Sequence, residues 1–327
     1  MIKNEFGFIM VFALVGVMLT FAASDVTAAE FPTRPVTFVV PYPPGGAADA
    51  GVRILANTAQ KYLGQPIVVE NKVGASGQVA GDYLARQKPD GYTVAHLFYS
   101  QTHPEYFRHF RESTSTSKDF RIVAQWTSHD PAVVVRADDP FNNLKDLIDY
   151  TKKNPGLAYG PGGGKGNFFH VSMTVFADTA GIKLVDVPTK GEGEIITQLL
   201  GGHLRVGVGN IATFAPQIKA GKIKAIALLA EHRSEEFPNV LTFKDQGFDI
   251  GIGDIYLAAY VPAKTPEPVV AKLRDAIKKT CQDPAFISGM KPVGTPVVYR
   301  DGEVVEKKIN DITTVLVKVF KEFGYLK

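Results

Sequence analysis

Between residues 36 and 98 the chain alternates short β-branched runs with stretches of helical character, and no other feature constrains its fold as strongly. The apolar runs predict buried strands of a parallel sheet, because helices cover both faces of such strands. The order strand–helix–strand–helix–strand is typical of a right-handed, doubly wound α/β sheet. The predicted strands cover residues 36–41, 66–70 and 92–98, and the predicted helices cover 47–63 and about 77–87.

The same alternation returns after residue 132 and predicts a second α/β unit. Asn143 is expected to cap the first helix of this unit. Two such units in 327 residues predict an α/β protein with two lobes. The predicted strands cover 132–136, 157–159, 184–187, 206–208, 225–229 and 256–260, and the predicted helices cover 143–153, 167–180, 192–200, 211–220, 267–280 and a last segment from about 303.

The first 29 residues have the layout of a secretory signal peptide rather than of a folded element. Lys3 gives a basic start, residues 6–23 are nearly all apolar or small, and residues 26–29 (VTAA) provide small residues for cleavage. An uncleaved membrane anchor is the alternative, since the apolar run is close to the shortest that can span a bilayer. We expect a periplasmic protein secreted through this segment.

Composition narrows the classes of partner. The formal charge is +3, and removal of residues 1–29 leaves 35 basic and 31 acidic residues, a net +4. This charge is too small to indicate nucleic-acid binding but is compatible with an anionic small ligand. Cys281 is the single cysteine, so an intramolecular disulfide is impossible, and its position predicts a small packing residue.

Three Gly-rich loops join a predicted strand to a predicted helix, at residues 43–46, 74–77 and 160–166. The first turn of a helix has free N–H groups and a partial positive charge, and glycine lets a ligand approach the backbone. A carboxylate or phosphate is the ligand group expected to bind there. Such loops lie at the carboxyl ends of strands, where ligands bind in open α/β sheets. Tight turns without a ligand are the alternative for each loop.

Local motifs argue against several enzyme classes. The run GPGGGKG at 160–166 lacks the spacing and the hydroxyl residue of a phosphate-binding loop. Ser76 does not fit the G-x-S-x-G elbow of hydrolases, and we expect it to cap a helix instead. No histidine pair has metalloprotease spacing, so neither a metal nor a cofactor is predicted. Asp49, in the first turn of its helix, is expected to bind the ligand or to fix the preceding loop.

The order of several motifs resembles the Bug/TctC family of solute receptors of tripartite tricarboxylate transporters. The match includes PYPPGG followed by Asp49, NKVGASG at 71–77 with its flanks, and PDGYT at 89–93. It continues through QLLGGHLRVGVGN and FAPQIKAGKIKAIAL to VPAKTPEPVVAKLRDAI, so that it covers nearly the whole chain after the predicted signal peptide.

The resemblance implies a Venus-flytrap fold with two hinge crossovers, in which lobe 1 comprises about 31–132 plus 258–327 and lobe 2 comprises 133–257. It implies a monomer that captures a small carboxylate and passes it to the membrane components of a transporter. The ligand-binding positions that it implies are Pro44, Gly45, Gly46, Ala47, Asp49, Gly74, Ala75, Ser76, Gly77, Ser100, Gly162, Gly166, Asn167, His170, Lys190 and Asn210, with the rest of the loop 160–167 and Gly191.

Departures from the family pattern concern the ligand. Gly209 and Arg205 stand where the family often has acidic residues, and Lys165 lies in an extended loop. These changes favour a more anionic ligand, whereas Phe98 and Tyr99 favour an aromatic acid. A receptor for a membrane sensor kinase would use the same cleft, so the sequence does not separate it from a transport receptor. An α/β enzyme is the third hypothesis, and it lacks a local signature of converging titratable groups.

Overall fold

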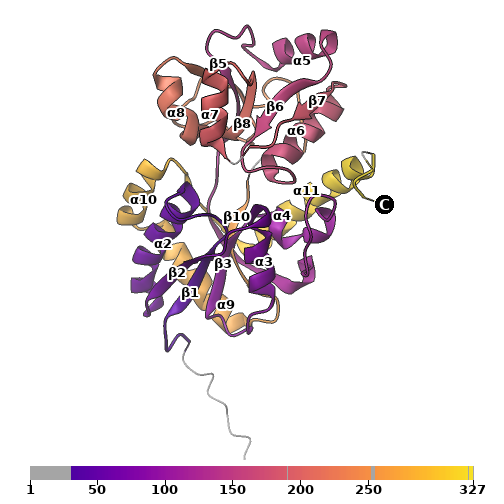
Figure 1. Ribbon diagram of the computed structural model, residues 1–327. Coiled ribbons are helices and arrows are strands. Elements are labelled where there is room, and N and C mark those ends of the chain that lie inside the picture. Colours follow the sequence, from indigo (N-terminus) through magenta and orange to yellow (C-terminus); the bar gives the residue numbers. More distant parts are fainter. Residues whose placement is uncertain (1–30, 190, 252–254, 323, 327) are drawn as a thin grey trace, which may run out of the picture.

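The computed structural model describes residues 31–189, 191–251, 255–322 and 324–326. These residues form two α/β lobes, each built on one β-sheet (Figure 1). The predicted fold class is confirmed. The predicted signal segment, residues 1–29, lies outside the described residues.

Lobe 1 contains a six-stranded mixed sheet in the order β11-β4-β10-β3-β1-β2. Strand β1 runs parallel to β2 and β3, whereas β10 is antiparallel to β3 and β4, and β11 is antiparallel to β4. The strands are β1 (Val36–Val40), β2 (Ile67–Asn71), β3 (Thr93–Leu97), β4 (Phe120–Thr127), β10 (Leu257–Pro262) and β11 (Val297–Asp301), and the helices are α2 (Ala47–Leu63), α3 (Gln78–Ala85), α4 (Tyr99–Thr102), α9 (Glu267–Cys281), α10 (Pro284–Met290) and α11 (Gly302–Glu322).

Lobe 2 contains a five-stranded sheet in the order β7-β6-β8-β5-β9. Strand β6 is parallel to β7 and β8, and β5 is antiparallel to β8 and β9. Asn143 caps its first helix by accepting a hydrogen bond from the N–H of Asp146, as predicted. The strands are β5 (Pro131–Arg136), β6 (Leu157–Pro161), β7 (Leu184–Asp186), β8 (Val206–Asn210) and β9 (Ile223–Leu228), and the helices are α5 (Leu144–Lys153), α6 (Phe168–Thr179), α7 (Glu192–Leu200) and α8 (Ile211–Lys219).

Strand β1 shows why the sheet of lobe 1 is covered on both faces. Phe38 packs in a hydrophobic cluster with residues of α2 and α9, whereas its neighbour Val39 packs in a second cluster with residues of α3 and α11. Successive side chains of a strand point to opposite faces, so a continuous apolar run needs helices on both sides. The buried Cys281 belongs to the α2–α9 cluster, which confirms its predicted packing role.

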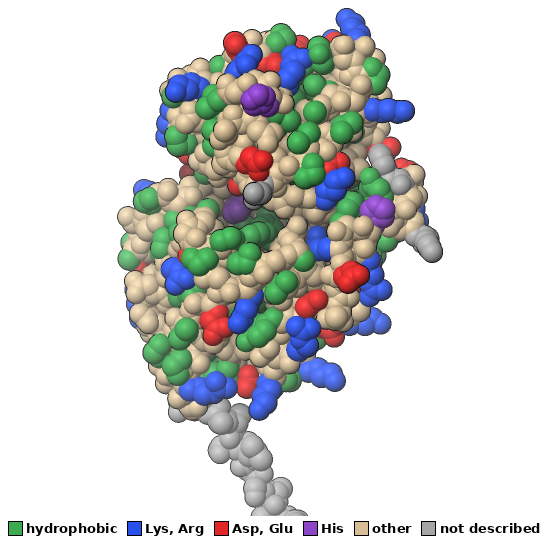
Figure 2. Space-filling view, viewed as in Figure 1, with side chains coloured by type: hydrophobic (Ala, Val, Ile, Leu, Met, Phe, Trp, Pro, Cys, Tyr) green, Lys and Arg blue, Asp and Glu red, His purple; other side chains and the backbone are tan. Residues whose placement is uncertain are grey.

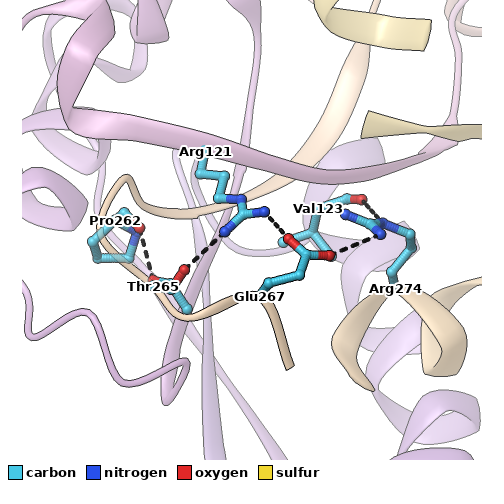
Figure 3. Close-up of polar contacts among 6 residues, drawn as sticks. All are labelled: Arg121, Val123, Pro262, Thr265, Glu267 and Arg274. Atoms are coloured by element: carbon cyan, nitrogen blue, oxygen red, sulfur yellow. Dashed lines mark hydrogen bonds and ion pairs between the residues drawn. The ribbon is translucent and has the colours of Figure 1, made fainter. Parts of the chain in front are cut away.

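The turn between β10 and α9 is fixed by charged side chains of lobe 1 (Figure 3). Glu267 at the start of α9 pairs with Arg121 from β4 and with Arg274, which lies 7 residues further along the same helix. Arg121 also donates to the carbonyl of Thr265 at 2.9 Å, and Arg274 donates to the carbonyl of Val123 at 3.2 Å. Both guanidinium groups are therefore engaged in holding α9 against β4.

The chain changes sheet between β4 and β5 and again between β9 and β10. The end of α11 reaches lobe 2 and contacts α6 (Figure 1). The residue boundaries at 132/133 and 257/258 remain a prediction for the limits of the lobes. Within the part of the chain that the structure describes, every helix is too short or too polar to cross a bilayer.

Candidate functional site

A cavity of about 380 Å³ lies between the lobes, where helix starts from both sheets meet. Figure 2 shows the molecule hollowed between the lobes, with hydrophobic side chains gathered on the lobe-1 side. The described residues that line the cavity are Tyr42, Pro43, Gly46, Ala47, Ala48, Ser76, Phe98, Ser100, His129, Gly162, Gly163, Asn167, Phe168, Phe169, Gly191, Glu192, Gly193, Asn210, Thr213 and Ile255.

The start of α2 faces the cavity from lobe 1. Gly46 is the N-cap residue, and no side chain caps the helix. Since Gly46, Ala47 and Ala48 line the cavity, the first N–H groups of α2 lie at its wall without a side-chain cap. Gly45, at φ +85°, allows the tight turn that leads into the helix. This end of α2 therefore has the free donors and the partial positive charge that attract an anion.

Asp49 holds the loop before α2 from behind. Its carboxylate accepts hydrogen bonds from the N–H of Gly45 at 2.9 Å, from Arg53 Nε at 2.9 Å and from Asn71 Nδ2 at 2.8 Å. The Arg53 guanidinium, with the donors Gly45 and Asn71, lowers the pKa of Asp49 to about 2. The side chain is buried and is absent from the described cavity lining, so its geometry matches the predicted loop-fixing role.

The loop before α3 takes a left-handed path. Gly74, Ala75, Ser76 and Gly77 all have positive φ, which is costly for Ala75 and Ser76. The buried Gln101 supports this path by donating to the carbonyl of Ser76 at 2.8 Å. The prediction that Ser76 caps a helix is wrong, because the N-cap residues here are Gly74 and Gly77 and neither helix start has a side-chain cap hydrogen bond.

The Gly-rich loop of lobe 2 is held by Asn167 and His170. Asn167 Oδ1 caps α6 by accepting from the N–H of His170 at 3.0 Å, and its amide donates to the carbonyl of Gly162. His170 Nδ1 accepts from the N–H of Gly166 at 3.3 Å. Burial lowers the pKa of His170 to about 4, so the ring is neutral at physiological pH. His170 thus supports the loop from behind instead of facing the cavity.

Glu192 is the first residue of α7 and its carboxyl group reaches the start of α8. Oε1 accepts a hydrogen bond from the N–H of Asn210 at 3.2 Å. A methyl group on Gly209 would lie 2.4 Å from Glu192 Cγ, and one on Gly162 would lie 3.0 Å from the same atom. The side chain therefore lies flat over the backbone of two glycines. Burial raises the pKa of Glu192.

Aromatic side chains form the rest of the wall. The ring of Phe98 lies between those of Tyr42 and His129, with centroid distances of 5.8 and 6.2 Å and edge-to-face geometry. Phe168 and Phe169 face the cavity from the first turn of α6. Burial lowers the pKa of His129 to about 4, so this ring is uncharged at physiological pH. The cavity thus has an apolar body with polar groups at the helix starts.

Three contacts connect the lobes beside the cavity. Arg111, in lobe 1, donates to the carbonyl of Gly166 at 3.0 Å and also to the carbonyl of Ser100. Ser76 Oγ donates to the carbonyl of Gly163 at 3.4 Å. The ring of Phe110 lies against Gly166, where a methyl group would come within 2.7 Å of Phe110 Cβ. The loop before α3 and the Gly-rich loop of lobe 2 are therefore in direct contact.

The structure brings nine of the predicted site residues together around the cavity and leaves twelve outside its described lining. Lys190 lies outside the described residues. The nine that line the cavity are Gly46, Ala47, Ser76, Ser100, Gly162, Gly163, Asn167, Gly191 and Asn210, and the twelve that do not are Pro44, Gly45, Asp49, Gly74, Ala75, Gly77, Gly160, Pro161, Gly164, Lys165, Gly166 and His170.

The residues thought to shape the ligand preference are distributed differently from the expectation. Arg205 pairs with Asp139 at 2.8 Å, and Lys165 pairs with Asp186 at 3.1 Å. Neither is among the described lining residues, so neither supports a more anionic guest. Phe98 lines the cavity as proposed for an aromatic acid, whereas Tyr99 is 1% exposed and packs in the core of lobe 1.

Several wall residues have no signal in the sequence. Their positions follow from tertiary packing, since they come from several elements of both lobes and none belongs to the three predicted Gly-rich loops. Among the described residues, no group of three or more His, Cys, Asp or Glu side chains could hold a metal ion. The missed wall residues are Tyr42, Ala48, His129, Phe168, Phe169, Glu192, Gly193, Thr213 and Ile255.

Comparison with known proteins gives consistent matches over most of the chain. The model of the tripartite tricarboxylate transporter family receptor matches residues 52–325. A UPF0065 protein from Cupriavidus necator is 34% identical over 265 residues, which cover 79% of this chain and 78% of the relative. The solved structure of periplasmic binding protein BugD is 30% identical with a TM-score of 0.73, over 90% of this chain and 99% of that one. MatC from Rhodopseudomonas palustris with bound malate is 25% identical with a TM-score of 0.74, over 88% and 100%.

Proposed function

Because this chain belongs to the tripartite tricarboxylate transporter receptor family, we propose that it captures a small carboxylate between its lobes and delivers it to a membrane transporter. The family identified from the sequence motifs is confirmed by the match over residues 52–325. This family and fold are those of solute-binding proteins rather than of enzymes. The proposal accordingly assigns binding, and not turnover, to the cavity.

The observation that carries the proposal is the uncapped start of α2 at the cavity between the lobes. Gly46 and Ala47 line the cavity, and no side chain satisfies the first N–H groups of the helix. Backbone donors at a helix start bind carboxylates without a cationic side chain, since the donors and the helix dipole act together. A carboxylate is therefore the ligand group that this wall fits best.

A relative with a bound ligand supports the chemical class. MatC binds malate, a dicarboxylate, and it has the same fold at 25% identity. We extend from that relative only the class of its ligand, a carboxylate. Which carboxylate this chain binds is inferred from its own residues.

The periplasm is the proposed compartment. BugD, a relative of the same fold, is a periplasmic binding protein. The predicted signal segment at residues 1–29 gives a route of export. Closure of two lobes around a solute suits delivery to a membrane complex, because the closed form presents both lobes together.

The test removes one backbone donor while keeping the helix. Proline is well accepted at the first position of a helix and has no N–H, and Gly46 before it already has an extended backbone with ψ 167°. Ala47→Pro should weaken carboxylate binding about tenfold, the effect of losing one hydrogen bond of roughly 1.5 kcal/mol to a charged group. Isothermal titration with a panel of mono- and dicarboxylates measures the dissociation constants.

Ala47→Val is the matched control, because valine has similar bulk and keeps the N–H group. A loss that both variants share reflects the added bulk at the cavity wall, so the tenfold difference is expected between Ala47→Pro and Ala47→Val. If no carboxylate in the panel binds to the parent protein, or if Ala47→Pro binds as tightly as Ala47→Val, the helix-start proposal is wrong.

A further inference from the structure

We infer that Glu192 is a specificity-determining residue that fills the lobe-2 side of the cleft with the protein's own carboxyl group. The ligand is therefore a monocarboxylate with an aromatic or apolar body, and not a di- or tricarboxylate. This inference rests on the proposed function, which supplies the carboxylate at the start of α2. It adds what the opposite wall accepts.

The position of Glu192 is built into the backbone around it. Its Oε1 accepts the N–H of Asn210 at 3.2 Å, and its Cγ lies over Gly162 and Gly209. Any side chain at Gly209 would collide with Glu192, since even a methyl group would come within 2.4 Å of Cγ. The surrounding backbone therefore fixes the position of the carboxyl group on the cavity wall.

Glu192 lies among the three helix starts that lobe 2 presents to the cavity, where an anion would otherwise be attracted. Glu192 begins α7, and Asn210, whose N–H it binds, is the N-cap residue of α8. Asn167 caps the third helix start of this wall, α6, with its side chain. An acidic group near a helix N-terminus satisfies its free donors and its partial positive charge. Two of the three helix starts on this wall are thus capped by side chains, and the third, α7, has no side-chain cap at Gly191 but begins with the carboxyl group of Glu192.

A second carboxylate on the ligand would meet Glu192 at short range. Like charges a few ångströms apart repel strongly where little water intervenes, and a buried unpaired charge is costly. Burial already raises the pKa of Glu192, which reflects the same scarcity of solvent. An uncharged group, or a hydrogen-bond donor, is what this side of the cavity accommodates.

The walls between the two ends favour an apolar body. Phe98, Tyr42 and His129 form edge-to-face pairs on the lobe-1 side, and Phe168 and Phe169 face them from lobe 2. Aromatic rings prefer such edge-to-face or offset neighbours. Among the described lining residues, Glu192 is the one acidic or basic side chain other than histidine. One anionic end and one apolar body describe a simple aromatic or aliphatic monocarboxylate.

The experiment compares matched ligands on the full mature protein by isothermal titration. Benzoate and terephthalate differ by one carboxylate, and malate represents small dicarboxylates. The parent protein should bind benzoate at least tenfold more tightly than terephthalate or malate. Glu192→Gln keeps the shape and a hydrogen-bond acceptor but removes the charge, so terephthalate should gain at least tenfold while benzoate changes less than threefold.

Glu194→Gln is the matched control, because Glu194 lies on the same helix, accepts from Gln198 at 3.0 Å and is absent from the described cavity lining. It should leave both dissociation constants unchanged. If the parent protein binds terephthalate or malate as tightly as benzoate, the inferred ligand class is wrong while carboxylate binding stands. If none of the three acids and no other carboxylate binds, the proposed function fails instead. An unchanged ratio in a folded Glu192→Gln variant removes Glu192 from the account.

Discussion

The two walls of the cleft differ in the side chains at their helix starts. In lobe 1, α2 begins at Gly46 without a side-chain cap. In lobe 2 the starts of α6 and α8 are capped by Asn167 and Asn210, and of its described helices only α7 begins without a side-chain cap. Glu192 adds a carboxyl group to the lobe-2 wall. Two lobes of similar α/β construction therefore present one wall with an uncapped helix start and no acidic side chain in the described lining, and one wall on which Glu192 places a carboxyl group at the remaining uncapped start. The comparison teaches that a shared fold does not imply a symmetrical binding site.

The loops behind these walls also differ in what holds them. The loop before α2 is fixed within lobe 1 by Asp49 and Asn71. The Gly-rich loop of lobe 2 is fixed by His170 from its own lobe and by Arg111 from lobe 1. The position of the lobe-2 loop therefore depends on contact between the lobes, whereas that of the lobe-1 loop does not.

Replacing Arg111 should have the largest effect on the free energy of unfolding, because it removes the support that lobe 1 gives to the lobe-2 loop. Its guanidinium bonds the carbonyls of Gly166 and Ser100 and the side chain of Gln78. Arg111→Met leaves these partly buried acceptors without a donor, which should lower the free energy of unfolding by about 3 kcal/mol. Urea denaturation followed by circular dichroism measures the change.

Arg108→Met is the control for Arg111, since Arg108 lies in the same segment but is exposed. It should change the free energy of unfolding by less than about 0.5 kcal/mol. Equal stabilities of the two variants would show that the lobe-2 loop does not need support from lobe 1.

Most of the fold could be predicted from the sequence because its signals are local. Glycine ends, β-branched runs and helical periodicity placed the strands and helices within a few residues of their observed bounds. Four of these helices and strands were missed: α4, β4, α10 and β11. Strand β4 pairs with β10 and β11, more than 130 residues away, so its place depends on contacts that a local pattern does not contain.

The candidate site could be predicted only in part, for a related reason. Gly46 and Gly162, which line the cavity, could be predicted because Gly-rich turns before helices are visible in the sequence. His129 and Ile255 reach the cavity from the segments between the lobes, and their neighbours in sequence give no sign of it. The positive φ of Ser76 depends on the support of Gln101, which follows a different strand. Convergence of distant segments, rather than local pattern, decides these positions.

Replacing Asp49 should have a smaller effect that depends on pH. Asp49→Asn introduces an amide donor opposite the donors Arg53 and Asn71, which should cost about 1–2 kcal/mol of unfolding free energy at neutral pH. The folded-state pKa of about 2 lies below the usual value of 3.8. The stabilisation by the wild-type carboxylate is therefore complete above about pH 4 and is lost as the pH falls toward 2. Urea denaturation across this range should show the two proteins converging.

Asp90→Asn is the control for Asp49. Asp90 pairs with Arg34 at 3.4 Å on an exposed part of lobe 1, and such surface pairs contribute little to stability. This variant should differ from the wild type by less than about 0.5 kcal/mol at every pH. A gap between Asp49→Asn and the wild type that persists below pH 2 would mean that the loop is held by packing and not by the charged carboxylate.

Replacing Phe98 should have the smallest effect, and it sharpens the comparison at the ligand itself. Phe98→Leu keeps an apolar side chain but removes the ring that lies between Tyr42 and His129. Aromatic pairs contribute about 0.5–1.5 kcal/mol beyond their buried area, so benzoate should bind about threefold to tenfold more weakly. Hexanoate has no ring and should lose less than twofold, which makes it the internal control. An equal loss for both acids would show that the lobe-1 wall selects apolar volume and not aromatic character, whereas no loss for either would place the body of the ligand against Phe168 and Phe169 instead.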